Sequence, residues 1–367
     1  MTFIIFVLIL GAVVLVHEFG HFINAKIFKT YVYEFSIGMG KRLWYFKKKG
    51  GETEYSIRLF PIGGFVRLAG EEVDDDKKIP KNRKLWAKSF WQRFLIMFAG
   101  AGFNFIFAIL LLFIIGISYG SVSTKPIIGS VSMNYPSYEA GLRDGDTVLS
   151  IDNVNVKTWD DMIWELTMKN GKETTFKVKD INANIKEIKV KPIKEVKENE
   201  ESYVYGISRD TTKYRGFSHA IDYTVTKTKS LFTVMFKTIG ALFTGGVSVK
   251  DLSGPVGIYS IVDTQSKAGF ESLLYLVAFL SINVGVINLG IKYFLYILAF
   301  LSINVGFINI LPFPAFDGGR ILFLIIEKIK GKPVDPKIEN TIHSIGFFLL
   351  LALIIYVTFN DILRLFS

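Results

Sequence analysis

Four stretches of the chain carry almost only apolar side chains. Residues 3–25 are apolar apart from four polar positions, residues 94–119 contain no charged residue, and residues 341–360 contain no Asp, Glu, Lys or Arg and a single histidine. At ~1.5 Å per residue, each of these three is long enough to cross a hydrocarbon core of ~30 Å. Each is therefore predicted to be a membrane-spanning helix. The fourth stretch, 273–316, has Lys292 as its only charge and is too long for one upright span.

The composition agrees with this pattern. Half of the 367 residues are hydrophobic, 21% are charged and the mean hydropathy is +0.36, which is outside the usual balance of a soluble globular chain. The chain has no cysteine. This excludes thiol catalysis, a disulfide scaffold and zinc bound by cysteine.

The distribution of charge predicts the topology. The net charge of +10 would be compatible with nucleic-acid binding if it were spread over a folded surface, but most of it lies in one loop. Residues 26–93 hold 16 Lys/Arg against 8 Asp/Glu, whereas residues 120–270 hold 20 against 18. Because Lys and Arg accumulate on the cytoplasmic side, 26–93 is predicted to be cytoplasmic and 120–270 extracytoplasmic. We expect no nucleic-acid partner.

Residues 127–210 are predicted to form a small β-rich domain with one or two helices. Short alternating segments flank a turn-forming run at 141–146, and 159–167 has a helical pattern. After this domain, apolar residues recur every three or four positions with lysines between them. That pattern predicts a basic amphipathic helix on the membrane surface within a linker at 211–270.

An eleven-residue segment occurs twice in the third hydrophobic region. Residues 278–288 recur at 299–309 with one substitution, a shift of 21 positions. One tandem copy does not make a solenoid and indicates a local duplication of about one span. A sequence artefact or a constructed variant would give the same pattern.

The first apolar stretch contains the sequence His17-Glu18-Phe19-Gly20-His21. On a helix, positions i and i+4 share a face, so both imidazoles can bind one zinc ion while the glutamate polarises a bound water. Ionisable side chains are costly in a bilayer, so this cluster needs compensation, which a metal would provide. The alternative is two histidines satisfied by neighbouring helices.

A catalytic zinc ion needs a third protein ligand and one open position. Asp317 is the best candidate, because prolines break the helix before it and two glycines follow it at the cytoplasmic end of the hydrophobic region. His219 and His343 are less well placed, one in the linker and the other at the start of the last span. The alternative for Asp317 is a cap for a helix that begins at Gly318.

These motifs together resemble the site-2 protease family of intramembrane zinc metalloproteases, of the bacterial regulator of sigma-E protease type. The resemblance spans essentially the whole chain: the His17–His21 motif in the first span, Asn309 to Asp317-Gly-Gly in a late span, and an insert at 127–210 that resembles a PDZ domain. It implies a polytopic α-helical membrane protein with an inserted extracytoplasmic PDZ-like domain and a membrane-dipping β-loop.

The resemblance also assigns roles by position. It implies that His17, His21 and Asp317 bind Zn²⁺ and that Glu18 is the general base. Substrate-binding positions implied in the same way are Asn304, Asn309, Gly63, Gly64 and Phe65, the last three within a β-loop at 56–71. Residues 98–104 resemble the family's second-span motif, with Ala101 where proline is frequent. The predicted segments are a first span at 1–25, a basic cytoplasmic loop at 26–93, a second span at 94–119, the PDZ-like domain at 127–210, the linker at 211–270, the third hydrophobic region at 271–320 and a last span at 341–362.

The implied activity is zinc-dependent cleavage of single-span membrane proteins in regulated intramembrane proteolysis. Substrates would be anti-sigma factors already trimmed by an upstream site-1 protease, or remnant signal peptides. The location would be the bacterial inner or plasma membrane, in contact with lipid. The PDZ-like domain would act as a size gate, or as a spacer without a peptide ligand.

The duplication leaves two other functions open. If both copies crossed the membrane, Asp317 would lie on the wrong side from His17 and His21, so an active enzyme requires one copy to be re-entrant, interfacial or looped out. A site disabled in this way would leave a PDZ-bearing membrane scaffold. A metal transporter is the second alternative, although the spans lack further carboxylates along a path.

Overall fold

The computed structural model describes residues 2–71, 78–197, 200–248, 256–257, 259–260 and 284–366. The chain divides into two compact units, which are described separately. The first comprises Met1–Leu111 and Ser253–Arg364, and the second comprises Leu112–Leu252 and Leu365–Ser367.

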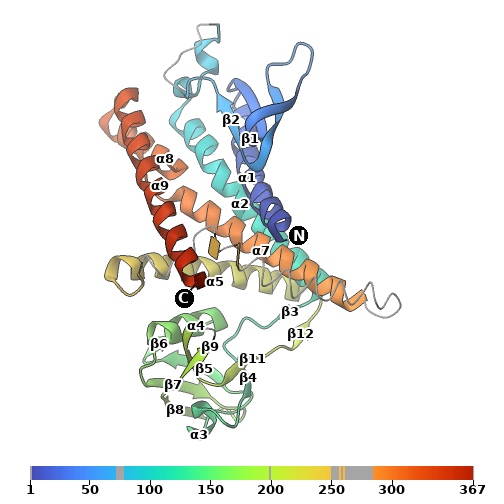
Figure 1. Cartoon of the computed structure of the whole chain (residues 1–367), viewed down its shortest axis with the longest axis vertical. Helices are drawn as coiled ribbons and strands as arrows, with labels where there is room; N and C mark the ends of the chain where they lie inside the picture. Colours follow the sequence, from blue (N-terminus) through green and yellow to red (C-terminus); the bar gives the residue numbers. More distant parts are fainter. Residues whose placement is uncertain are drawn as a thin grey trace. The chain divides into compact units, whose positions relative to one another are not determined.

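The first unit is built on apolar helices (Figure 1). Among the residues that the structure describes, three helices are long and apolar enough to cross a membrane: Phe3–Ile27 within α1 (Thr2–Ile27), all of α2 (Phe90–Tyr119), and Lys337–Leu363 within α9 (Pro336–Phe366). This confirms the three predicted spans as helices of membrane-crossing length. The segment before α2 adds two short 3₁₀ turns, η1 (Lys81–Arg83) and η2 (Leu85–Ala87).

The long strands β1 (Val32–Lys47) and β2 (Glu54–Leu68) form a folded hairpin beside α1. Residues 34–37 of β1 pair on one side with 54–57 and on the other with 64–67, while 42–47 pair with 54–58. The chain can double back in this way because Gly38, Gly40 and Gly63 adopt positive φ angles of 87°, 83° and 89°. The result is that 64–68 is an outer segment with a described strand on one side only.

The third hydrophobic region forms a helix, a turn and a second helix. Helix α7 (Val284–Ile310) contains the whole second copy of the repeat and residues 284–288 of the first. Residues 278–283 of the first copy lie outside the described part of the chain. The turn at 311–316 leads into α8 (Asp317–Lys330), so this helix begins one residue before the predicted start at Gly318. Its cap position is Phe316, which makes no side-chain cap bond, so Asp317 is not the cap.

The second unit confirms the predicted β-rich region. Its main sheet has the order β6-β5-β7-β8 and all pairings are antiparallel. Three further pairs join β9 with β10, β4 with β11, and β3 with β12. The strands are β3 (Ser121–Val122), β4 (Ile128–Val131), β5 (Thr147–Ile151), β6 (Val154–Asn155), β7 (Thr174–Lys179), β8 (Ile185–Val190), β9 (Ile193–Lys197), β10 (Glu200–Val204), β11 (Ile207–Arg209) and β12 (Lys213–Tyr214).

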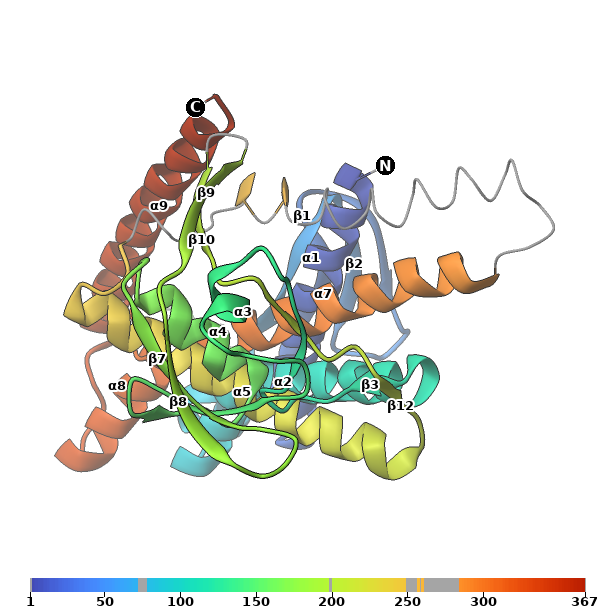
Figure 2. The ribbon, with the colours of Figure 1, turned by 90° about the horizontal axis from the view of Figure 1, so that it is seen from below.

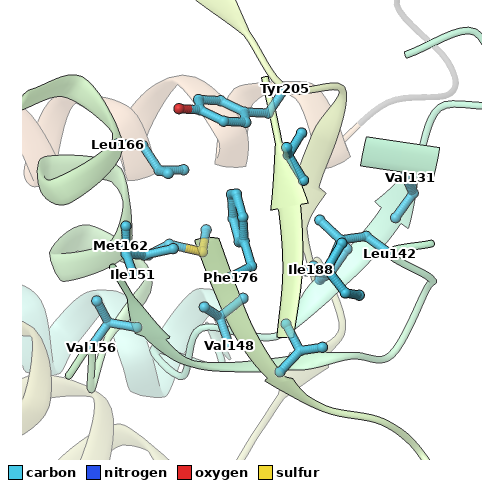
Figure 3. Packing of buried hydrophobic residues seen from close by; sticks show 13 residues of the cluster. Val131, Leu142, Val148, Ile151, Val156, Met162, Leu166, Phe176, Ile188 and Tyr205 are labelled. Atoms are coloured by element: carbon cyan, nitrogen blue, oxygen red, sulfur yellow. The ribbon is translucent and has the colours of Figure 1, made fainter. Parts of the chain in front are cut away.

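Alternating side chains of these strands form the core of the second unit. Phe176 of β7 is fully buried and lies between Met162 of α4 (Trp159–Met168) and Ile188 of β8 (Figure 3). Tyr205 covers the ring of Phe176 edge-on, with ring centroids 5.6 Å apart. Helix α4 matches the helix predicted at 159–167, and the short helix α3 (Pro136–Glu139) is a second one, which agrees with the prediction of one or two helices.

Helix α5 (Phe217–Thr244) lies along α4 in both ribbon views (Figures 1 and 2). Nζ of the buried Lys227 donates to Oδ2 of Asp160 at 2.7 Å, and the Ser230 hydroxyl donates to the same oxygen at 2.8 Å. Burial raises the pKa of Asp160, but Lys227 and Ser230 outweigh this effect and hold that pKa below its ordinary value. The Lys227–Asp160 pair therefore stabilises this unit at pH values above the ordinary pKa of aspartate. This contribution is lost as the pH falls through the pKa of Asp160 in the folded state.

Replacing Lys227 with methionine should destabilise the packing of α5 on α4. The substitution keeps the apolar stem but leaves the Asp160 carboxylate half-buried without its cation, at a cost of about 1–3 kcal/mol. Amide hydrogen exchange in α4 should become roughly tenfold faster or more in the full-length chain. Lys229→Met, at an exposed position of the same helix, is the control and should leave exchange unchanged; equal exchange in both variants would contradict the structural role of the pair.

Candidate metal centre

Two histidines on one face of α1 are the first two candidate metal ligands. His17 and His21 are one helical turn apart, with ring centroids at 4.8 Å and ring planes at 78°. Their Nε2 atoms are 3.1 Å apart. His17 is buried and His21 is nearly so. The helix therefore directs both rings to one point inside the first unit.

The third group comes from the turn between α7 and α8. Pro312 and Pro314 prevent α7 from continuing, and the chain reverses over 311–316. Gly318 allows the new helix to pack against the end of α7, because a Cβ there would lie 2.1 Å from the Leu311 carbonyl oxygen. This close approach directs Asp317 towards α1.

The three side chains fit one zinc ion. Oδ2 of Asp317 is 3.0 Å from Nε2 of His17 and 3.2 Å from Nε2 of His21. A tetrahedral zinc ion with bonds of about 2.0–2.1 Å holds its ligand atoms about 3.3 Å apart. Asp317 Oδ2 is also buried with no well-oriented hydrogen-bond donor among the described residues. Two imidazole nitrogens and one carboxylate oxygen form a donor set typical of catalytic zinc, which leaves one position open.

Helix α2 fixes the orientation of both imidazoles. Nδ1 of His21 donates to the Ile96 carbonyl oxygen at 2.8 Å, which leaves the Nε2 lone pair facing Asp317. Nδ1 of His17 lies 3.4 Å from the amide nitrogen of the fully buried Asn104. A 180° rotation of the Asn104 amide would exchange its nitrogen and oxygen. Oδ1, which has no partner within the described residues, would then accept from the His17 Nδ1–H. Both histidines would then offer Nε2 to the metal.

Two glycines make room for the imidazoles against α2. A Cβ at Gly20 of α1 would lie 2.3 Å from the Ala99 carbonyl oxygen, so this glycine permits the close approach of the two helices. A Cβ at Gly100 would lie 2.4 Å from His21 Nε2 and 2.7 Å from His17 Nε2. The imidazole pair thus occupies the space that any side chain at position 100 would need.

A cavity of about 230 Å³ opens beside the three side chains. Glu18 lines it, adjacent to His17 on α1, and the outer segment of β2 forms one wall through Phe65, Val66 and Leu68. The lining also includes Arg320 and Glu71, whose guanidinium and carboxylate form an ion pair that connects the end of β2 to α8. The candidate ligands on α1 and at the start of α8 therefore share this cavity with residues of β2 and α2.

The structure brings some of the predicted substrate-binding residues to this cavity and not others. Gly64 lies against Glu18, since a Cβ there would be 3.6 Å from the Glu18 Cγ, and Phe65 lines the cavity. Gly63 forms the bend before them. Asn304 and Asn309 lie on α7 outside the cavity lining, and the Asn304 amide donates to the Phe300 carbonyl of its own helix at 2.7 Å.

Sequence reasoning did not assign roles to several residues around the site. Gly100 and Asn104 belong to a second-span motif that was recognised only by resemblance, and their spacing of four positions on a helix would have placed them on one face. Glu71 and Arg320 are 249 positions apart, and nothing local in the sequence indicates that they pair. Such contacts follow from the tertiary arrangement alone.

Comparison with known proteins agrees with this chemistry. Residues 5–290 and 289–353 match the model of peptidase family M50, and the two stretches meet between the copies of the repeat. A zinc metalloprotease of Clostridium acetobutylicum is 34% identical over 98% of this chain and 96% of its own length. The zinc metalloprotease RasP of Bacillus licheniformis is 32% identical, and the regulator of sigma-W protease RasP of Bacillus subtilis is 31% identical, each over 100% of this chain and 99% of the relative.

Gly100→Ala should abolish tight zinc binding. The new methyl group would overlap both imidazoles, and the ring nitrogens would have to leave the positions that face Asp317. Zinc content after dialysis, measured by atomic absorption, should fall well below one ion per chain. Gly102→Ala is the matched control, because its Cβ would meet only the Phe98 ring at 3.3 Å, and it should keep its zinc. Retention of one tightly bound zinc by the Gly100 variant would contradict the assignment.

Proposed function

Since the chain belongs to peptidase family M50 and is a zinc metalloprotease, we propose that His17, His21 and Asp317 hold its zinc ion and that Glu18 is the general base. The observation that carries the proposal is the convergence of the three ligand atoms, which all lie within 4.8 Å of one another although Asp317 is 300 residues from His17 in sequence. This convergence occurs in a chain that contains the duplication, which argues against a site disabled by it.

The residues around the cavity would have separate roles in peptide hydrolysis. Zinc bound at the cluster would polarise the scissile carbonyl and make a water molecule nucleophilic near neutral pH. Glu18, which lines the same cavity, would take the proton of the attacking water and return it to the leaving amine. The Ile96 carbonyl and Asn104 would hold the imidazoles in the tautomer that binds metal.

We propose that the substrate is a single-span membrane protein that is cut within or near the bilayer. The backbone amides of a helical substrate are hydrogen-bonded within the helix, so the substrate must unwind locally before cleavage. The 64–68 segment of β2 could accept the unwound chain as an added strand, because it has a described neighbour only at 32–37 and lies along the cavity. The Pro61 carbonyl lies against Gly11, halfway along α1, which supports a β-loop that enters the membrane.

The remaining assignments are proposals of the same kind. Asn304 and Asn309 would satisfy carbonyls of the unwound substrate, for which Asn304 must release its bond to Phe300. The β-rich second unit would be an extracytoplasmic PDZ-like domain that limits access. The location would be the bacterial inner or plasma membrane. The name of the B. subtilis relative, regulator of sigma-W protease, supports anti-sigma factors as substrates. We propose that a site-1 protease trims them first.

Cleavage of a tagged single-span protein, truncated outside the membrane, tests the activity with purified chain and zinc. Glu18→Gln should lower the cleavage rate by roughly 10²–10⁴ while keeping zinc, because it removes only the proton acceptor. Asp317→Asn should lose both zinc and cleavage. Asp335→Asn is the control: Asp335 is exposed, its carboxylate accepts from the Lys337 amide, and asparagine preserves that bond. Full activity of the Glu18 variant would exclude the proposed base.

Val66→Pro tests strand addition. Proline removes one backbone N–H and stiffens the segment, so cleavage of a helical substrate should fall at least tenfold. Val66→Ala keeps the backbone donor and should retain most activity. Both variants are compared at equal zinc content, so that damage to the metal site is not mistaken for loss of pairing. Unchanged cleavage by the proline variant would rule out pairing along 64–68.

A further inference from the structure

The turn at 311–316, which leads into Asp317, is hydrogen-bonded to the last helix through His343. The Ala315 amide donates to Nδ1 of His343, on α9, at 3.1 Å. Since Nδ1 accepts, the neutral imidazole carries its proton on Nε2. Two glycines bring these elements together: a Cβ at Gly346 of α9 would lie 2.4 Å from the Pro314 Cβ, and one at Gly319 would lie 3.2 Å from the His343 Cε1.

Ala315 needs such a bond because its backbone is strained. Its φ of 86° lies in the left-handed region that residues with a Cβ rarely adopt, and it is two positions before Asp317. The neighbouring bonds of the turn are internal, from Phe313 to Leu311 and from Phe316 to Phe313. The bond to His343 is thus a side-chain contact from another helix that holds the turn in this conformation.

We propose that His343 is a positioning residue for the third zinc ligand. By accepting from Ala315, it stabilises the left-handed turn and so keeps Asp317 Oδ2 within 3.0–3.2 Å of the two histidines. It does not itself bind the metal in this role. The inference rests on the proposed function, because it presumes that Asp317 is a ligand. The last span would then take part directly in building the metal centre.

Three variants separate this role from general packing. His343→Leu fills similar space without an acceptor. His343→Asn places an amide oxygen close to the Nδ1 position, so it keeps the acceptor. Ala315→Gly removes the strain that the bond opposes, since glycine adopts positive φ without a steric penalty. The full-length chain in detergent is used throughout, with zinc affinity measured by competition against a chromophoric chelator and ligand geometry by the visible spectrum of the Co²⁺-substituted protein.

His343→Leu should weaken zinc binding by roughly 10–100-fold, the effect expected when a residue that orients a ligand is lost. His343→Asn should stay within a few-fold of the parent chain. Adding Ala315→Gly to His343→Leu should recover at least half of the lost affinity on a logarithmic scale and restore the Co²⁺ spectrum. Recovery by either route also shows that the leucine variant had not simply unfolded.

Two results would contradict the proposed role of His343. Parental zinc affinity in His343→Leu would overturn the inference, as would equal weakening in the leucine and asparagine variants without recovery by Ala315→Gly. Asp317→Asn, measured alongside, separates this outcome from failure of the proposed function. If Asp317→Asn loses zinc and His343→Leu does not, only the role of His343 is wrong; if Asp317→Asn keeps zinc, the ligand assignment itself is wrong.

Discussion

The close contact between α1 and α2 is the constraint on which the rest of the site depends. Two imidazoles and a carboxylate are costly among apolar helices unless they compensate one another. Gly20 lets the helices approach, Gly100 leaves space for both rings, and the α2 backbone accepts the Nδ1–H of His21. With the rings held on one side by α2, their Nε2 atoms face Asp317 beside the cavity.

The irregular segments serve this centre from the other side. The turn at 311–316 directs Asp317 inward, and the bends in β1 and β2 place an outer strand segment along the cavity beside Glu18. The Glu71–Arg320 ion pair connects these two parts. Irregular backbone from both parts lines the cavity: Ala315 and Phe316 from the turn, and Phe65 and Val66 from the outer strand segment.

Sequence periodicity and spacing predicted the parts of this architecture that are local. Long apolar runs predicted α1, α2 and α9, alternation and turn residues predicted the β-rich unit, and the i, i+4 spacing of His17 and His21 predicted that they share a face. The sequence did not predict that β1 and β2 double back, because pairing 34–37 on both sides depends on bends at glycines. Nor did it distinguish His343 from an ordinary interfacial histidine, since its partner Ala315 is 28 positions away.

The central claim is that one zinc ion is bound by two imidazoles and one carboxylate with a position left for water. X-ray absorption at the zinc edge of the purified, zinc-loaded chain tests it most directly. We expect four ligands, two of them imidazoles, with zinc–nitrogen and zinc–oxygen distances of about 2.0–2.2 Å. A spectrum without imidazole scattering, or with a third imidazole in place of the carboxylate, would contradict the account.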